Sequence, residues 1–142
     1  MSWLLDTNVV SDIARKRPNP GVKAWLARHA ALEHRLFVSA ATVGEILLGI
    51  VGLPAGDPAR PALLQWAERD VRGRFSGRIL AFDEDVATTW AEMSAARPGG
   101  YNQPILDSII AATALHYRLV LVTRNIEDFR RVAGLKLENP FT

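Results

Sequence analysis

The chain has 142 residues, of which 49% are hydrophobic and 23% charged, with a formal net charge of +2 and no cysteine. This composition suits one domain spanning residues 1–142 and excludes an intrinsically disordered chain. The lack of cysteine excludes disulfides, zinc–thiolate sites and cysteine nucleophiles. The small net charge does not by itself indicate nucleic-acid binding.

The start of the chain does not have the pattern of a signal peptide. Asp6 interrupts the apolar start, and the longest apolar stretch, 43–53, is too short to span a bilayer and contains Glu45. We therefore expect a cytoplasmic protein with no membrane partner.

The first half of the chain alternates short apolar runs with amphipathic segments. Residues 2–5 are expected to form a buried strand, followed by a helix over 9–16 that ends before two prolines. A second helix is expected from 22 to about 34, with apolar residues on one side. A strand over 36–39 and a helix over 41 to about 51 complete this half.

The second half continues the alternation. A helix is expected from 61 to about 75, with proline near its first position. Asp83 is expected to cap a helix that runs to Arg97, and Pro104 opens another helix to about His116. The remaining expected elements are strands at 79–82 and 119–123, an edge strand at 136–138, and loops at 52–58 and 98–103.

Four polar residues stand where this pattern places the carboxyl ends of the strands. Strands separated by helices predict an α/β protein with a mainly parallel sheet covered on both faces, and such sheets bind ligands beyond the carboxyl ends of their strands. Asp6 ends the first strand, and Asn125 lies just past the strand at 119–123. Glu45 follows the second strand by about a turn and a half of helix, and Asp107 lies in the first turn of a later helix, on its apolar face. We expect all four at one rim.

Each of these residues also has a purely structural interpretation. Asp6 and Asn8 can make a turn and cap a helix, Glu45 can be solvated, Asp107 can complement a helix dipole, and Asn125 can serve a turn. Together at one rim they indicate a site, because three carboxylates in apolar surroundings repel one another without a cation. Oxygen ligands without thiolate or imidazole favour Mg²⁺, with Mn²⁺ as a substitute.

Five segments carry a resemblance to a known family. They are 4–11 (LLDTNVVS), 38–46 (VSAATVGEI), 105–114 (ILDSIIAATA), 121–129 (LVTRNIEDF) and 139–141 (NPF). Each motif is weak alone, but the ordered set resembles the PIN-domain ribonuclease toxins of the VapC and FitB type nearly from end to end.

The resemblance implies a fold, an activity and a set of site residues. The fold is a three-layer α/β/α PIN-like domain with a sheet of four or five strands. The activity is that of a divalent-metal-dependent endoribonuclease that leaves a 5′-phosphate and a 3′-hydroxyl. The catalytic positions are Asp6, Glu45, Asp107 and Asn125, of which the three acids bind metal. Many relatives have aspartate at the fourth position, so the neutral Asn125 leaves the number of metal ions open, and Asp128 is an alternative ligand nearby.

The chemistry of such a site follows from its donors. A bound ion polarises the scissile phosphate and lowers the pKa of a bound water. Thr7 and Asn125 are expected to hydrogen-bond a metal-bound water or a carboxylate, and Arg124 to neutralise a phosphate. Asn8, Thr123 and Asp128 are further candidates for contact with the metal shell or the substrate.

The resemblance also implies partners. It implies RNA as substrate, a homodimer, and a small antitoxin that neutralises the toxin in a type II pair, with operator DNA bound through the antitoxin. We expect the antitoxin to insert an arginine toward the acids and to cover an apolar groove offered by Val10, Ile13, Trp25 and Leu48. Alternatively, these four residues pack only in the core.

Three other functions are compatible with parts of the pattern. A PIN-domain nuclease can process RNA without an antitoxin, and an inactive PIN-like module can bind without cleaving. Phosphatases of the haloacid-dehalogenase type also place an acid after the first strand, but they have a second aspartate two residues later, where this chain has Asn8.

Overall fold

The strands form a single sheet in which all pairs are parallel. The computed structural model describes residues 1–99 and 102–142, and the sheet order is β3-β2-β1-β4-β5. The strands are β1 (Trp3–Leu5), β2 (Leu36–Ser39), β3 (Ile79–Leu80), β4 (Val120–Val122) and β5 (Leu137–Glu138). The expected α/β fold with a parallel sheet is confirmed, and the predicted edge strand is β5, which pairs with β4.

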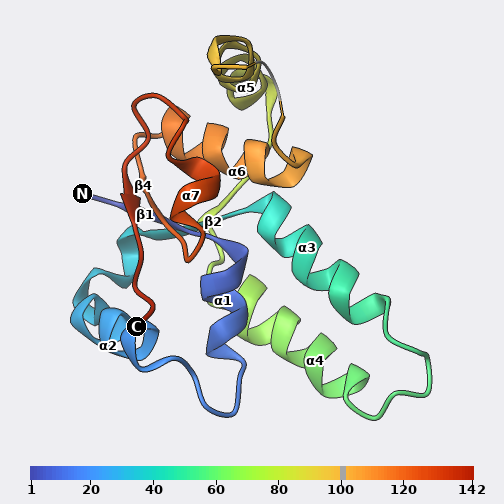
Figure 1. Cartoon of the computed structure of the whole chain (residues 1–142). Helices are drawn as coiled ribbons and strands as arrows, with labels where there is room; N and C mark the ends of the chain where they lie inside the picture. The colour runs from blue at the N-terminus through green and yellow to red at the C-terminus, as the bar shows by residue number, and fades with distance from the viewer. Residues whose placement is uncertain (100–101) are drawn as a thin grey trace.

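Helices cover both faces of the sheet (Figure 1). They are α1 (Thr7–Ile13), α2 (Pro20–Arg28), α3 (Ala40–Val51), α4 (Arg60–Trp66), α5 (Glu84–Ala96), α6 (Ile105–His116) and α7 (Ile126–Phe129). Two shorter helical segments are the 3₁₀ segment η1 (Ala30–Arg35) and the π-helical η2 (Ala67–Gly73). The result is the expected three-layer α/β/α arrangement.

The alternation of side chains along the central strand divides the core in two. Trp3 and Leu5 pack into one cluster with residues of α1, α2, α3 and η2, whereas Leu4 between them packs into the other, with residues of α6. Successive side chains of a strand point to opposite faces, so three consecutive apolar residues serve both layers. A strand buried on both faces is fixed at the centre of the fold, which positions its carboxyl end.

Two of the predicted helices differ from the structure. The helix expected over 22–34 begins earlier, at Pro20, because the Asn19 side chain accepts from the backbone N of Gly21 and caps it. It also ends earlier, at Arg28, and Leu32 within η1 has non-helical angles. The helix expected over 61–75 starts as α4 but continues as the π-helical η2.

Other boundaries shift by a few residues. The first helix begins directly after Asp6, two residues before the expected 9–16, and ends at Ile13. Asp83 caps α5 as predicted, accepting from the backbone N of Val86 at 2.9 Å. Of the loop expected at 98–103, residues 100 and 101 lie outside the described part of the chain.

Helices α3 and α4 run side by side away from the sheet (Figure 1). Their exposed large apolar side chains include Leu48, Val51 and Leu64. In the part of the chain that the structure describes, no helix is both long and apolar enough to cross a membrane.

Candidate functional site

Asp6 lies at the carboxyl end of the central strand and is almost fully buried. Its Oδ1 accepts from the backbone N of Thr7 at 2.8 Å, which caps α1. Its Oδ2 accepts from Thr123 Oγ1 at 2.7 Å and from Asn8 Nδ2 at 3.2 Å. The parallel pairing of Leu5 with Val122 puts Asp6 beside Thr123, because both residues directly follow that pair.

Burial raises the pKa of Asp6 above its ordinary value, and the negative charge of Glu45 raises it further. The hydrogen bonds from Thr123, Thr7 and Asn8 act in the opposite direction, because they stabilise the ionised carboxylate. Asp6 is thus a desolvated acid whose charged form is supported by three donors.

Glu45 reaches the same rim from α3. The helix starts directly after β2, where the hydroxyl of Ser39 caps it by accepting from the backbone N of Ala41. Glu45 is half-buried, and its Oε1 accepts from Thr7 Oγ1 at 2.8 Å. Thr7 therefore joins two acids, since its backbone N donates to Asp6 and its hydroxyl to Glu45.

Asp107 lies half-buried in the first turn of α6. Its pKa is raised to about 6, first by burial and then by the negative charges of Asp6, Glu45 and Asp128. The structure thus brings the three acids predicted from the sequence into electrostatic contact, with Asp128 as a fourth. Their mutual repulsion is the feature that a bound cation relieves.

The other predicted residues take different places. Asn125 is exposed, and its backbone N donates to Thr123 Oγ1 at 3.0 Å. Arg124 is exposed, with its backbone N donating to Asn8 Oδ1 and its guanidinium over the ring of Phe141. The side chain that touches Asp6 from the β4 end is therefore that of Thr123.

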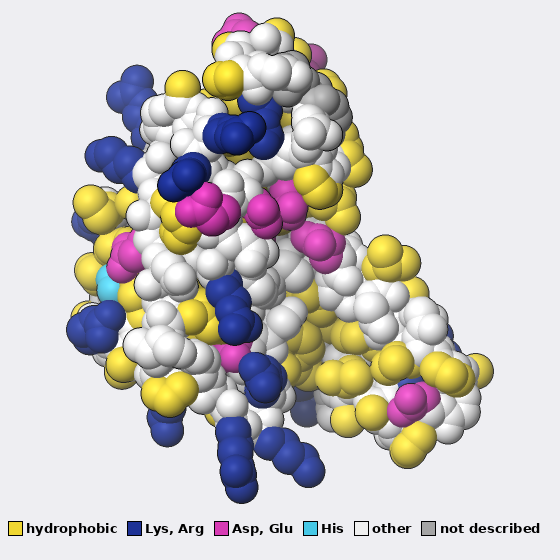
Figure 2. Space-filling model, viewed as in Figure 1, with side chains coloured by type: hydrophobic (Ala, Val, Ile, Leu, Met, Phe, Trp, Pro, Cys, Tyr) yellow, Lys and Arg dark blue, Asp and Glu magenta, His cyan; other side chains and the backbone are white. Residues whose placement is uncertain are grey.

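A cavity of about 270 Å³ opens beside Asp107. We call it the rim cavity, and it is lined chiefly by Arg97, Gln103, Asp107, Asp128, Arg130 and Arg131. In Figure 2, acidic side chains gather at the middle of this face, with basic side chains above and below them. A cavity lined by both acids and arginines suits a phosphodiester bound through a metal ion.

Sequence reasoning gave no role to Arg97 or Gln103. Gln103 is buried, accepts from Arg97 at 3.0 Å through Oε1, and donates to the backbone O of Asp128 at 3.2 Å. Neither residue carries a sequence signal, because the hydrogen bonds that hold them join α5, Gln103 and α7, which are separate in the sequence.

The acids of this rim offer only oxygen atoms to a metal ion. Among residues 1–99 and 102–142, no three acidic, histidine or cysteine side chains are arranged as a complete metal-binding group. Asp6, Glu45 and Asp107 nevertheless fit a hard cation that keeps much of its water, because they offer only oxygen atoms and repel one another. Mg²⁺ is usually held in this way, by one or two carboxylates, waters and substrate phosphates.

Fold and site together define an α/β protein with an acidic site at the carboxyl ends of parallel strands. Its similarity to known proteins shows the family. The PIN domain model matches residues 3–135. The chain belongs to the PIN-domain family, whose ribonucleases generally use a divalent metal ion.

Curated relatives match almost the whole chain. It is 39% identical to Toxin FitB of Neisseria gonorrhoeae over 97% of each chain. It is 34% identical to VapC ribonuclease Y4jK of Sinorhizobium fredii, over 97% of this chain and 96% of the relative.

Solved structures give the same result. A structure of FitAB bound to a DNA fragment contains a chain that is 36% identical to this one and aligns with a TM-score of 0.85. The alignment covers 98% of this chain and 95% of that chain. The crystal structure of FitAcB from Neisseria gonorrhoeae aligns with a TM-score of 0.83 at 36% identity, over 96% of each chain.

Proposed function

We propose that this chain is a divalent-metal-dependent endoribonuclease that acts as the toxin of a type II toxin–antitoxin pair. The observation that carries the proposal is the pair of full-length relatives, named as a toxin and a ribonuclease, combined with the electrostatic contact of Asp6, Glu45 and Asp107. The metal we propose is Mg²⁺, because the donors are oxygen atoms and the site retains room for water and phosphate.

The residues divide the work. Asp6, Glu45 and Asp107 would hold the ion, which supplies a polarised phosphate and a water of lowered pKa when bound. Thr7 fixes Asp6 and Glu45 relative to each other, and Thr123 stabilises the ionised form of Asp6 by donating to it. Preorganised carboxylates of this kind need no rearrangement before the reaction.

The arginines of the rim cavity would bind the RNA substrate. Arg97, Arg130 and Arg131 line this cavity together with Asp107 and Asp128, and guanidinium groups pair with phosphate oxygens in bidentate geometry. The RNA strand would thus contact both the acids and the arginines of this cavity, and cleavage would leave a 5′-phosphate and a 3′-hydroxyl. Arg124 and Asn125 are kept as candidates for contact with the substrate on the β4 side.

The proposed partner is a small antitoxin. Structures of FitAB and VapBC bound to DNA are similar to this chain, which supports a complex that binds operator DNA through the antitoxin. A toxin homodimer within that complex is part of the proposal. The groove expected at Val10, Ile13, Trp25 and Leu48 needs correction, because Val10 and Trp25 are 1% exposed and pack in the core. The exposed apolar residues of α3 and α4 are the better candidates.

The test is expression of the chain alone and with the small open reading frame beside its gene, followed by mapping of new RNA ends. We expect growth arrest and new 5′-phosphate ends with the toxin alone, and neither when both proteins are made. RNA cleavage without growth arrest would instead favour an RNA-processing nuclease, and metal binding without cleavage an inactive module.

A further inference from the structure

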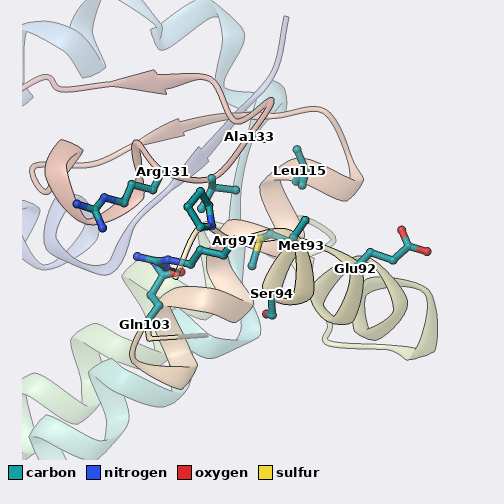
Figure 3. Close-up of a pocket in the computed structure, with 11 residues that line it drawn as sticks. Glu92, Met93, Ser94, Arg97, Gln103, Leu115, Arg131 and Ala133 are labelled. Atoms are coloured by element: carbon teal, nitrogen blue, oxygen red, sulfur yellow. Dashed lines mark hydrogen bonds between the residues drawn. The ribbon is translucent and has the colours of Figure 1, made fainter. Parts of the chain in front are cut away.

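A second cavity, of about 350 Å³, lies next to the rim cavity between α5, α6 and the segment after α7. We call it the apolar cavity, and its main lining residues are Met93, Arg97, Gln103, Leu115, Val132 and Ala133. Figure 3 shows Arg97 reaching across toward Gln103 and the carboxylate of Glu92 pointing away. The volume is within the range of small-ligand pockets, about 300–1,000 Å³.

The two cavities share a wall. Arg97, Gln103 and Arg131 line both of them. The wall is held by two hydrogen bonds, from Arg97 to Gln103 Oε1 and from Gln103 Nε2 to the backbone O of Asp128. The two cavities therefore adjoin at these side chains, and the apolar cavity is the immediate neighbour of a ligand bound at Asp107.

The lining indicates what kind of group enters. Its apolar side chains come from three segments, with Met93 on α5, Leu115 on α6 and Ala133 after α7. The two arginines of the lining, Arg97 and Arg131, lie at the wall shared with the rim cavity. An apolar lining with arginines at one wall matches a ligand that has a flat, largely apolar group attached to an anionic backbone. Nucleotides have both, because a base is joined to a phosphate. Arginine planes also stack on unpaired bases.

The position along α6 indicates which nucleotide is bound. Leu115 follows Asp107 by eight residues, which corresponds to about 12 Å along the helix axis. The Leu115 end of the apolar cavity is thus too far from Asp107 to hold the scissile group, and it suits the base of a neighbouring nucleotide.

We propose that the apolar cavity receives one nucleobase of the RNA strand, next to the scissile phosphate, while Arg97 and Arg131 at the shared wall pair with the adjoining phosphates. The proposal rests on the proposed ribonuclease function and adds a source of sequence preference to it. Apolar pockets discriminate between similar groups by roughly 10- to 200-fold, so the cut sites should show a base preference at one flanking position.

The experiment fills the cavity from its exposed side. Ala133 is exposed and lines the cavity, so Ala133→Trp occupies the space without altering the acids, and Ala133→Leu is a smaller replacement should the first variant not fold. Ala27→Trp is the matched control, since Ala27 is exposed on α2 away from both cavities. Purified proteins cleave an RNA library with randomised positions in Mg²⁺ or Mn²⁺, and the cut ends are sequenced.

We expect wild-type protein and Ala27→Trp to share a preference of about tenfold or more at one position beside the cut bond, and Ala133→Trp or Ala133→Leu to lose it while still cutting. Cleavage with no preference at any flanking position, or with the same preference in the Ala133 variants, would overturn the base pocket and leave the ribonuclease function standing. No RNA cleavage by wild-type protein with either metal would overturn both.

Discussion

The hydroxyl of Thr123 donates a 2.7 Å hydrogen bond to Oδ2 of Asp6, although the two residues are 117 positions apart in the chain. The contact exists because β1 and β4 are adjacent and parallel, so that the residue after each strand stands at the same rim. Thr123 Oγ1 also accepts from the backbone N of Asn125. The hydroxyl therefore connects the first acid to the turn that contains Asn125.

This relationship predicts different effects for two neighbouring residues. Thr123→Val removes a donor from a buried carboxylate, which costs about 1–3 kcal/mol when a buried partner is left unsatisfied. We expect loss of stability of this size and a large fall in RNA cleavage. Asn125→Ala should change both much less, because the Asn125 side chain is exposed and its backbone N remains. Urea unfolding and initial cleavage rates measure the two effects, and a greater loss in Asn125→Ala would reverse the assignment.

Metal binding should stabilise the fold. A ligand that binds only the folded state at 100 times its Kd adds about 2.7 kcal/mol to the free energy of unfolding. We expect Mg²⁺ and Mn²⁺ to raise the melting temperature of wild-type protein and to have little effect on Asp6→Asn or Asp107→Asn. Asp70→Asn, which removes an exposed acid on η2, is the control and should respond like wild type. An equal rise in all four proteins would show that the metal binds elsewhere.

The raised pKa of Asp107 predicts a pH effect in EDTA. Folding holds this carboxyl protonated up to a pKa of about 6, whereas its ordinary value is 3.8. As pH rises between these values the unfolded chain loses the proton first, so ionisation of Asp107 destabilises the folded state. Asp107→Asn cannot ionise there and should gain stability relative to wild type across this window.

The measurement is chemical unfolding of both proteins at several pH values from below 4 to above 6. The difference between them is the informative quantity, because Asp6 and the other acids are common to both. A difference that does not change with pH would refute the effect. The same variant should lose RNA cleavage, so gain of stability and loss of activity are expected together.

Inhibition by the antitoxin is expected to use charge. A guanidinium pairs with carboxylates in bidentate geometry and stays charged, and Asp6, Glu45 and Asp107 repel one another without a cation. We predict that one antitoxin arginine approaches Asp6 and Asp107 and competes with the metal. Replacing each antitoxin arginine by alanine and measuring residual cleavage across Mg²⁺ concentrations tests this. The mechanism fails if no replacement restores cleavage and Mg²⁺ never competes.

Several features of the fold were determined by local sequence. The apolar run at 3–5 can only be buried, and the acid after it ends the strand and caps the following helix. Asp83 before α5 and Pro104 before α6 also act within a few residues of themselves. Such signals depend on capping and hydrophobic burial, and they were readable without knowledge of the fold.

The candidate site was predictable in part for the same reason. Asp6, Glu45 and Asp107 stand in apolar surroundings at the ends of predicted elements, so their convergence followed from the expectation of a parallel sheet. In the structure burial, and after it the negative charges of Asp6 and Glu45, raise the pKa of Asp107, whereas the catalytic roles of the three acids remain predictions.

Tertiary contacts decided the rest. The break after α2 and the π-helical turn of η2 depend on packing against other elements, which no local pattern records. The choice of Thr123 over Asn125 as the partner of Asp6 depends on strand register, and the wall made by Arg97 and Gln103 depends on the approach of α7 to a distant loop. Local sequence indicates which segments are apolar and which residues cap helices, whereas the close approach of polar groups from separate elements is fixed only when the layers pack together.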